Sequence, residues 1–500
     1  MNGMKTAVNP AKGDRSLTEN PQILIIGAGI AGISCGEYLT RNGLTNFKIL
    51  EATDRTGGRI WSVELDNEGG KAEMGANWIH GIERNPIYKI ADQNHLLQLR
   101  NADKSLRHKD VFITEDGEMI NDKVVKEVDW VYGMTIQECE EFYQMGMPTP
   151  GENDSVGEYL RQCIDEQLEK YSNDQRRIRE LIVNQRISLE CCVSGCNSLN
   201  DLSLSEYGSY EELPGIHYTI PPGFESVLEV LKKNIPQENM VLNTPVKCIN
   251  WNQNNSTNNN EYGVCVELEN GEKMYANHVV VTVSVGVLKA NAAHFFNPQL
   301  PIEKLRAIDH IGFGVVNKVM LEFDEQIVDP DVFRIELLWD KTPDDDSDLA
   351  SSWFKKIYSF EVDHEHVLIG PVAVVGWLSG REAMYIESLT EEQIGNDCVA
   401  VLKKFLKKDI PKPKRVIRTT WGSNQYTRGA YSYVAVGGTA QEMETLGEPL
   451  IADNGKAQVL FAGEATHKSF YSTTHGALLT GQREAQRIID IYSEAAPISS

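Results

Sequence analysis

The stretch "ILIIGAGIAG", residues 23–32, decides the fold that this sequence predicts. Its apolar first half is typical of a buried strand, and it runs directly into Gly27, Gly29 and Gly32 in the spacing G-x-G-x-x-G. Glycines in this spacing permit a tight turn, close approach of the backbone to a pyrophosphate and close packing of the next helix on the strand. The stretch therefore predicts the start of a dinucleotide-binding β-α-β unit.

The residues after the predicted helix support the same unit. A second strand, "FKILE", ends on Glu51, where a carboxylate can accept hydrogen bonds from a ribose diol and disfavours a phosphate. "EATDRTGGR" then adds the pair Gly57 and Gly58, where a second backbone stretch can touch the ligand, and Arg59, which can pair with phosphate. A nicotinamide enzyme needs neither feature, so the pattern favours a different dinucleotide.

Composition limits the architecture and the partners. A chain of 500 residues exceeds one ordinary core, so two domains are expected. It carries 48 basic and 72 acidic residues, a formal net charge of −24, which repels nucleic acid and anionic membranes and attracts cations. An odd number of cysteines, 9, and the lack of an apolar signal peptide predict reduced thiols in an intracellular protein. Residues 1–20 are expected to be a disordered leader.

Hydrophobic patterns further along predict alternating helices and strands. Residues 154–189 have helical spacing, with Ser155 and Glu158 as a capping box at the start. Residues 263–283 predict a hairpin that leads into a buried strand. Further elements are expected as strands at 315–323, 372–378 and "VLFAG" (459–463), and as a helix at 476–492. This order predicts the α/β class.

Six motifs together resemble the flavin-containing amine oxidases, and most closely their animal polyamine oxidase group. The motifs are "ILIIGAGIAG", "LEATDRTGGRI", "EMGANWIHG", "VVVTVSVGVLK", "WGSNQYTRGAYSY" and "FAGEATHKSFYSTTHGALLTGQREA". They follow the family's order from about residue 22 to 492. The resemblance implies an α/β fold in which a doubly wound, Rossmann-like FAD-binding domain is interleaved with an α+β substrate domain. The latter is expected to have a mixed sheet flanked by helices.

The resemblance also implies boundaries for the two interleaved domains. FAD-binding segments are expected at 21–105, 215–300 and 410–500, and substrate-domain segments at 106–214 and 301–409.

The resemblance further implies which residues hold FAD. Glu464 is expected near the ribityl-pyrophosphate part, Val246 near the adenine, and the backbone N–H of Thr474 at the flavin ring, where the positive end of a helix meets the charge of the reduced ring. FAD should bind non-covalently, because Ala430 stands where covalently flavinylated monoamine oxidases carry a cysteine. The full expected set is Gly27, Gly29, Gly32, Glu51, Gly58, Arg59, Asn77, Val246, Glu464 and Thr474.

Two titratable residues are the expected catalytic pair. An isolated histidine is more often packed or exposed, but in "NWIHG" the resemblance puts His80, with Trp78, on the substrate side of the flavin. There it can hydrogen-bond the amine and favour the unprotonated nitrogen. Strand alternation puts Lys318 on one face with Val316 and Met320, where half-burial is expected. Its family counterpart holds a water beside the reactive flavin nitrogen.

Substrate recognition is expected from a smaller set of residues. Tyr431 matches one wall of the family's aromatic cage, while the other wall falls on Thr473, which leaves room for a long chain. Ser472 and Thr473 can hydrogen-bond amino groups. Asp201 and Ser203 match a pair that holds a terminal ammonium in vertebrate spermine oxidases. The alternative interpretation of Asp201 is a helix cap.

We therefore expect an FAD-dependent polyamine oxidase that converts spermine, with dioxygen, to spermidine, an aminoaldehyde and hydrogen peroxide. The alternatives are an N-acetylpolyamine oxidase, a histone lysine demethylase and a non-catalytic flavoprotein that binds polyamines. No metal, nucleic-acid or membrane partner is expected. The chain ends in "PISS" rather than in a Ser-Lys-Leu signal, which favours the cytoplasm over the peroxisome.

Overall fold

The structure is a computed structural model, and it describes residues 19–65, 71–97, 109–150, 154–253, 262–344, 346–362 and 372–493. Most of the predicted leader, residues 1–18, lies outside the described residues. Among the described helices, none is long and apolar enough to cross a membrane.

The glycine fingerprint opens a six-stranded sheet with the strand order β19-β20-β10-β1-β2-β6. All neighbours are parallel except the edge pair β19 and β20, which is antiparallel. The strands are β1 (Ile23–Ile26), β2 (Phe47–Leu50), β6 (Met240–Val241), β10 (His278–Val281), β19 (Leu450–Ile451) and β20 (Ala457–Phe461). Strands from both ends and the middle of the chain therefore share one sheet.

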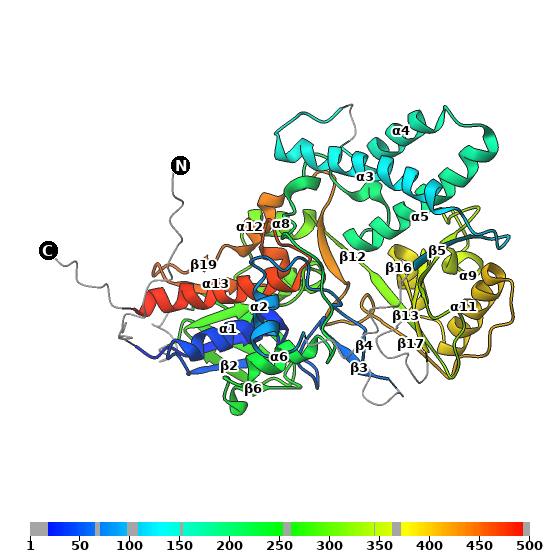
Figure 1. Cartoon of the computed structure of the whole chain (residues 1–500). Coiled ribbons are helices and arrows are strands. Elements are labelled where there is room, and N and C mark those ends of the chain that lie inside the picture. The colour runs from blue at the N-terminus through cyan, green and yellow to red at the C-terminus, as the bar shows by residue number, and fades with distance from the viewer. Residues whose placement is uncertain are drawn as a thin grey trace, which may run out of the picture.

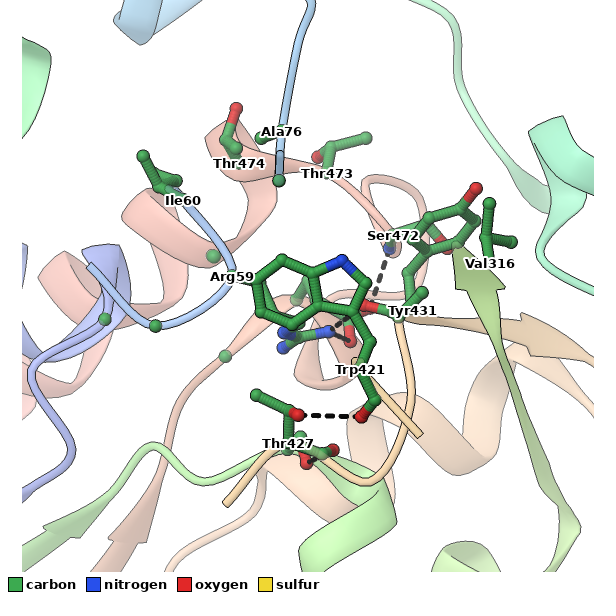
Figure 2. Close-up of a pocket in the computed structure, with 18 of the residues that line it drawn as sticks. Arg59, Ile60, Ala76, Val316, Trp421, Thr427, Tyr431, Ser472, Thr473 and Thr474 are labelled. Carbon is green, nitrogen blue, oxygen red and sulfur yellow. Dashed lines mark hydrogen bonds and ion pairs between the residues drawn. The ribbon is translucent and has the colours of Figure 1, made fainter. Parts of the chain in front are cut away.

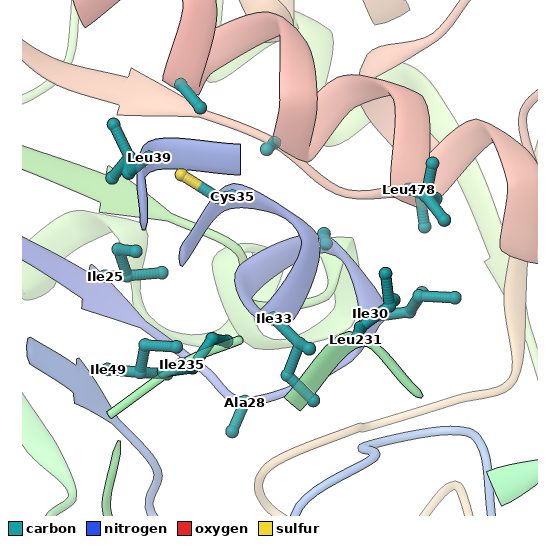
Figure 3. Close-up of a cluster of buried hydrophobic side chains, with 14 of the residues drawn as sticks. Ile25, Ala28, Ile30, Ile33, Cys35, Leu39, Ile49, Leu231, Ile235 and Leu478 are labelled. Carbon is teal, nitrogen blue, oxygen red and sulfur yellow. The ribbon is translucent and has the colours of Figure 1, made fainter. Parts of the chain in front are cut away.

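Both faces of this first sheet are covered, which explains why its strands are continuously apolar. One face packs against α1 (Ile30–Arg41), α6 (Glu225–Lys232) and α13 (Thr474–Tyr492), where Ile33, Leu231 and Leu478 pack with Ile25 and Ile49 (Figure 3). The other face packs against a smaller sheet and further helices. These are β7 (Val246–Asn250), β8 (Val264–Leu268), β9 (Lys273–Ala276), β11 (Phe296–Asn297), α7 (Val285–Phe295) and α12 (Ala440–Gly447). The predicted doubly wound α/β architecture is confirmed.

A second six-stranded sheet has the order β17-β13-β16-β15-β14-β5. It is mixed, because β14 and β5 are parallel while the other neighbours are antiparallel. Its strands are β5 (Lys109–Thr114), β13 (Val316–Phe323), β14 (Val332–Leu338), β15 (Ser359–Val362), β16 (Val372–Ser379) and β17 (Arg415–Arg418). One face is covered by α10 (Gly380–Ile386), α11 (Glu391–Leu406) and the short helix Trp353–Lys356, which directly follows α9 (Leu349–Ser352). Figure 1 shows this sheet and the first one in opposite halves of the molecule.

The segment predicted as helical at 154–189 forms two helices of a three-helix layer. The layer consists of α3 (Asp122–Gln144), α4 (Val156–Leu168) and α5 (Asn173–Ser194), and it lies above the second sheet in Figure 1. The Ser155 side chain caps α4 by accepting the Glu158 N–H at 3.3 Å. The chain leaves the helical path between α4 and α5, where Ser172 becomes the N-cap of α5.

The remaining elements connect the two sheets. They are β3 (Ser62–Glu64), β4 (Lys71–Glu73), α2 (Pro86–Gln93), α8 (Ile302–His310), β12 (Ile311–Gly314) and β18 (Tyr431–Val434). The domain boundaries stay a prediction. However, β17 follows residue 410 and still pairs with β13, so the third FAD-binding segment carries one strand of the second sheet.

Candidate active site

A cavity of about 990 Å³ lies between the glycine end of the first sheet and one face of the second. It collects most of the predicted site residues from seven separate stretches of the chain. Those that line it are Gly27, Gly29, Glu51, Gly58, Arg59, Asn77, Trp78, His80, Val246, Lys318, Tyr431, Glu464, Ser472, Thr473 and Thr474. Gly32, Asp201 and Ser203 are not among the described residues that line it.

The fingerprint glycines form one wall without side chains. A Cβ on Gly29 would meet only the Gly57 carbonyl oxygen, at 4.0 Å, so the space in front of it belongs to the cavity. A Cβ on Gly32 would lie 2.0 Å from the Gly27 carbonyl oxygen, so Gly32 serves the contact between α1 and the turn. The Gly57 N–H donates to the Ala28 carbonyl at 2.8 Å, and this bond holds the pair Gly57 and Gly58 against the fingerprint glycines. Such a cradle suits a pyrophosphate.

Glu51 is fixed at the same wall by its own neighbours. It is 8% exposed, and its carboxylate accepts the backbone N–H groups of Ala28 at 2.8 Å and Thr53 at 2.9 Å. The Thr53 hydroxyl adds a third bond at 2.8 Å. The fixed negative charge favours the hydroxyl donors of a ribose and disfavours a phosphate.

Arg59 and Glu464 form an ion pair in the cavity wall. Arg59 Nη1 lies 2.9 Å from Glu464 Oε1 and also donates to the Ala430 carbonyl at 2.8 Å. Glu464 is 4% exposed and further accepts the Ser432 hydroxyl at 2.5 Å and the Ser472 N–H at 2.8 Å. These bonds hold the guanidinium where it can pair with a phosphate.

The helix α13 begins at the cavity, with Thr473 and Thr474 side by side in Figure 2. The Thr473 hydroxyl accepts the Gly476 N–H at 2.9 Å and donates to the Phe470 carbonyl at 2.7 Å. The Ser472 hydroxyl donates to the Ser432 carbonyl. Both hydroxyl hydrogens are thus engaged, so the oxygens of Ser472 and Thr473 are left as acceptors, which is the role an ammonium donor requires. The helix start also brings a positive dipole end to the cavity.

His80 lies in the cavity wall on a loop held by the β-bridge between Ile79 and Tyr218. Its ring meets the His217 ring edge to face, with centroids 5.3 Å apart. Burial and the neighbouring His217 lower the pKa of His80 to about 4. The ring is therefore neutral near pH 7 and can hydrogen-bond a neutral amine without repelling an ammonium.

We expect His80→Asn to lower kcat/KM for an amine substrate about fivefold, through the loss of one hydrogen bond worth about 1 kcal/mol. Because the pKa of His80 is lowered to about 4, the wild-type ring is already neutral above pH 5. The substitution should therefore leave the limbs of the pH profile between pH 5 and 9 in place. Steady-state profiles of both proteins check this, and a limb near pH 6.5 that vanishes in the variant would contradict it.

Lys318 is more deeply buried than strand alternation predicts. It is 3% exposed, because β13 lies inside the second sheet with both of its faces covered. Its Nζ donates to the carbonyl oxygens of Glu73 at 2.5 Å and Gly75 at 2.8 Å, and it lies 4.2 Å from the Trp377 ring centroid. Burial lowers the pKa of Lys318 to about 8, against the raising effects of Glu73 and Glu361. An amine with a pKa so close to neutrality can take up and release protons.

Tyr431 and Trp421 are among the aromatic side chains that line the same cavity. Tyr431 is the predicted one, and its hydroxyl donates to the Cys192 carbonyl. Burial keeps the pKa of Tyr431 well above its ordinary value, so the ring stays neutral. Trp421 was missed by the sequence analysis, although it opens the motif "WGSNQYTRGAYSY"; it is 7% exposed and packs at 89° against Trp61. Figure 2 shows Trp421 and Tyr431 at the cavity, where aromatic faces can hold an amine.

In the structure, Asp201 and Ser203 both have local hydrogen-bond partners, and their role in substrate binding stays a prediction. Asp201 accepts the Ser198 N–H at 3.0 Å and completes the capping box of a short helix, Leu199–Asp201. The buried Ser203 hydroxyl donates to Asp154 at 2.6 Å. The alternative interpretation, a helix cap, describes Asp201, because a nearby backbone N–H satisfies its carboxylate.

Five further glutamates line the cavity and were missed by the sequence analysis: Glu140 of α3, Glu190 of α5, Glu212, Glu269 and Glu361. Burial raises the pKa of Glu140, and the nearby charges of Glu212 and Glu190 raise it further. Burial likewise raises the pKa of Glu190, which accepts the hydroxyls of Tyr207 at 2.8 Å and Ser194 at 2.9 Å. The only sequence signal is Glu190 as a charged residue in the otherwise apolar run "SLECCV".

The residues present fit a dinucleotide and offer no metal centre. The glycine cradle, Glu51, Arg59 and the start of α13 supply the open wall, ribose acceptor, phosphate partner and helix end that FAD requires. Within the described part of the chain, no group of at least three His, Cys, Asp or Glu residues could hold a metal ion. All nine cysteines are free thiols, as predicted.

Comparisons with known proteins give a consistent result. The family model described as "Flavin containing amine oxidoreductase" matches residues 30–489. The chain is 37% identical over 502 residues to the peroxisomal N(1)-acetyl-spermine/spermidine oxidase of Bos taurus, covering 95% of this chain and 96% of that protein. The Homo sapiens protein of the same name is 37% identical over 500 residues, with the same coverage. A triple mutant of putrescine oxidase has a similar solved structure, with a TM-score of 0.67 at 19% identity, covering 94% of this chain and 99% of that one, and it supports the fold alone.

Proposed function

The chain belongs to the flavin-containing amine oxidoreductase family, and on this premise we propose that it is a polyamine oxidase whose preferred substrate is spermine. The two relatives described above are named for polyamine substrates, and they match nearly the whole of both chains. FAD is the cofactor, and we infer that it binds non-covalently, because Ala430 offers no nucleophile.

The observation that carries the proposal is a group of three glutamates that line the cavity. Glu140, Glu190 and Glu212 come from three separate segments, and the charges of Glu212 and Glu190 raise the pKa of Glu140, which is the effect of repulsion between like charges. A cationic chain relieves this repulsion, whereas a neutral aryl amine does not. A long substrate with several ammonium groups therefore fits this cavity better than a compact amine.

Each residue has a defined task in the proposed reaction. FAD, when bound, would supply the acceptor for a hydride from the carbon beside an amine nitrogen, and its reoxidation by dioxygen would give hydrogen peroxide. His80 hydrogen-bonds the amine that reacts and favours its unprotonated form. The rings of Tyr431 and Trp421 hold the chain and exclude water from it. Lys318 holds and moves a proton at its Nζ, next to the reacting groups.

The test is an anaerobic mix of the purified enzyme with spermine, with N-acetylspermine and with benzylamine, while the bleaching of flavin absorbance is followed. We expect spermine to bleach the flavin fastest and benzylamine slowest, because only the polyamines place an ammonium beside the glutamates. A variant with Glu190→Gln should raise the apparent Kd for spermine about fivefold, for a loss of about 1 kcal/mol.

A matched variant, Asp201→Asn, separates cavity effects from capping effects. Asp201 caps a short helix, so this substitution should change stability and leave the apparent Kd for spermine unchanged. Equal effects of the two variants on spermine binding would remove Glu190 from the proposed site. Bleaching by none of the amines would overturn the substrate class.

A second candidate is an N-acetylpolyamine oxidase, and the observation that favours it is the printed name of the relatives. An acetylated polyamine still carries free amines that the glutamates can attract. Faster bleaching by N-acetylspermine than by spermine would establish this candidate in place of the first.

Partners and location are also part of the proposal. We expect dioxygen as the second substrate and no binding to nucleic acid or anionic membranes, on the basis of the net charge of −24. A cytoplasmic location is our prediction from the sequence, whereas the two relatives are named as peroxisomal proteins. Imaging of the full chain with an internal tag distinguishes the two.

A further inference from the structure

One face of the second sheet carries a row of polar side chains that starts at Lys318. The strand register puts Lys318 of β13 opposite Trp377 of β16, Glu361 of β15 opposite Arg334 of β14, and Arg334 opposite Asp110 of β5. Trp377 and Glu361 are joined by a hydrogen bond from the indole N–H to the carboxylate, at 3.3 Å. The five side chains therefore cross five neighbouring strands, from the deeply buried lysine to the partly exposed Asp110.

The row alternates positive and negative charge along the cavity wall. Lys318, Trp377, Glu361 and Arg334 all line the cavity. The Arg334 guanidinium donates to both carboxylate oxygens of Asp110, at 3.2 and 3.0 Å, and this ties it to the outer end of the row. Glu361 is therefore the carboxylate that lies between the two cations.

Glu361 and Lys318 influence each other's ionisation. Burial raises the pKa of Glu361, while Arg334, Lys318 and the Trp377 hydrogen bond lower it. Burial lowers the pKa of Lys318, while Glu73 and Glu361 raise it. The other titratable groups that face Glu361 are Asp110, Glu336 and Tyr358. An apolar side chain at Glu361 would avoid the cost of a desolvated charge, whereas here the two cations of the row stabilise that charge.

We propose that Glu361 is a positioning residue for the reaction, which acts through Lys318: its carboxylate is held by the same Trp377 indole that the lysine ammonium contacts, and its negative charge faces that ammonium along the row. This inference rests on the role proposed above for Lys318 and not on which amine is oxidised. Glu361 is held for this task by the Trp377 indole and the Arg334 guanidinium. Removing its charge should therefore shift the ionisation of Lys318 to lower pH.

The test uses the holoenzyme without any amine. Flavin absorbance is titrated against pH, and the reoxidation rate of dithionite-reduced enzyme is measured across the same range; Lys318→Met identifies the transition that belongs to Lys318. We expect Glu361→Gln to move that transition down by about one pH unit, the size expected for loss of one nearby opposite charge. Glu361→Asp, which keeps the charge, should hold the transition near its wild-type position.

The matched control is Glu336→Gln, a buried carboxylate on the same sheet face that contacts Arg334 and is not among the described residues lining the cavity. It should move the transition by much less than Glu361→Gln. An unmoved transition in Glu361→Gln, or an equal shift in the control, overturns the proposal. Neither outcome bears on the polyamine assignment, because no amine is present.

Discussion

Lys318→Met should slow flavin reduction by amine, or reoxidation by dioxygen, by about tenfold or more, which corresponds to about 1.4 kcal/mol of barrier. Methionine keeps the length and much of the volume of the side chain but has no proton to hold. The lysine ammonium donates to the carbonyl oxygens of Glu73 and Gly75 and lines the cavity, so we expect its charge and its proton to act directly at the reacting groups. Stopped-flow absorbance measures the two half-reactions separately.

Lys304→Met is the matched control for this prediction. Lys304 is 4% exposed and donates to the carbonyl oxygens of Thr445, Leu446 and Glu448 at 2.7, 2.8 and 2.7 Å, but it is not among the described residues lining the cavity. Its substitution should lower the free energy of unfolding and leave both half-reactions unchanged. If Lys318→Met leaves both rates at the wild-type value, Lys318 has no part in the mechanism.

Gly29→Val should weaken FAD binding by about a hundredfold or more, about 2.8 kcal/mol, with little loss of protein stability. The backbone of Gly29 has φ −73° and ψ 179°, which valine adopts without strain, and a Cβ there meets no protein atom closer than 4.0 Å. The added side chain would instead fill the space in which a pyrophosphate approaches the backbone. Titration of the apoprotein with FAD, followed by flavin fluorescence, gives the Kd.

Gly32→Ala separates cofactor binding from folding. A Cβ at Gly32 would lie 2.0 Å from the Gly27 carbonyl oxygen, so this smaller substitution should lower the melting temperature of the apoprotein markedly. Substitutions at the two glycines of one fingerprint should therefore have different effects: at Gly29 on the affinity for FAD, and at Gly32 on the stability of the apoprotein. A Gly29→Val protein that binds FAD with wild-type affinity would show that the pyrophosphate does not use this wall.

The sequence by itself determined the features that depend on neighbours along the chain. The strand, glycines and helix of residues 23–41 form the predicted unit, because turn geometry and hydrophobic period are local properties. Glu51, Arg59 and His80 could be predicted because each stands in a motif whose order along the chain is itself a signal. Lys318 could be predicted from strand alternation and its family counterpart, and all four residues line the cavity.

Only the tertiary structure decided which carboxylates face the substrate side. Asp201 had a plausible motif, but a backbone N–H three residues away satisfies it, while Glu140 and Glu212 come from segments with no motif and meet across the cavity. The depth of Lys318 and the row that leads from it to Asp110 likewise depend on how five strands pair. Burial and distant charges set the pKa of a side chain, and neither can be read from its neighbours in sequence.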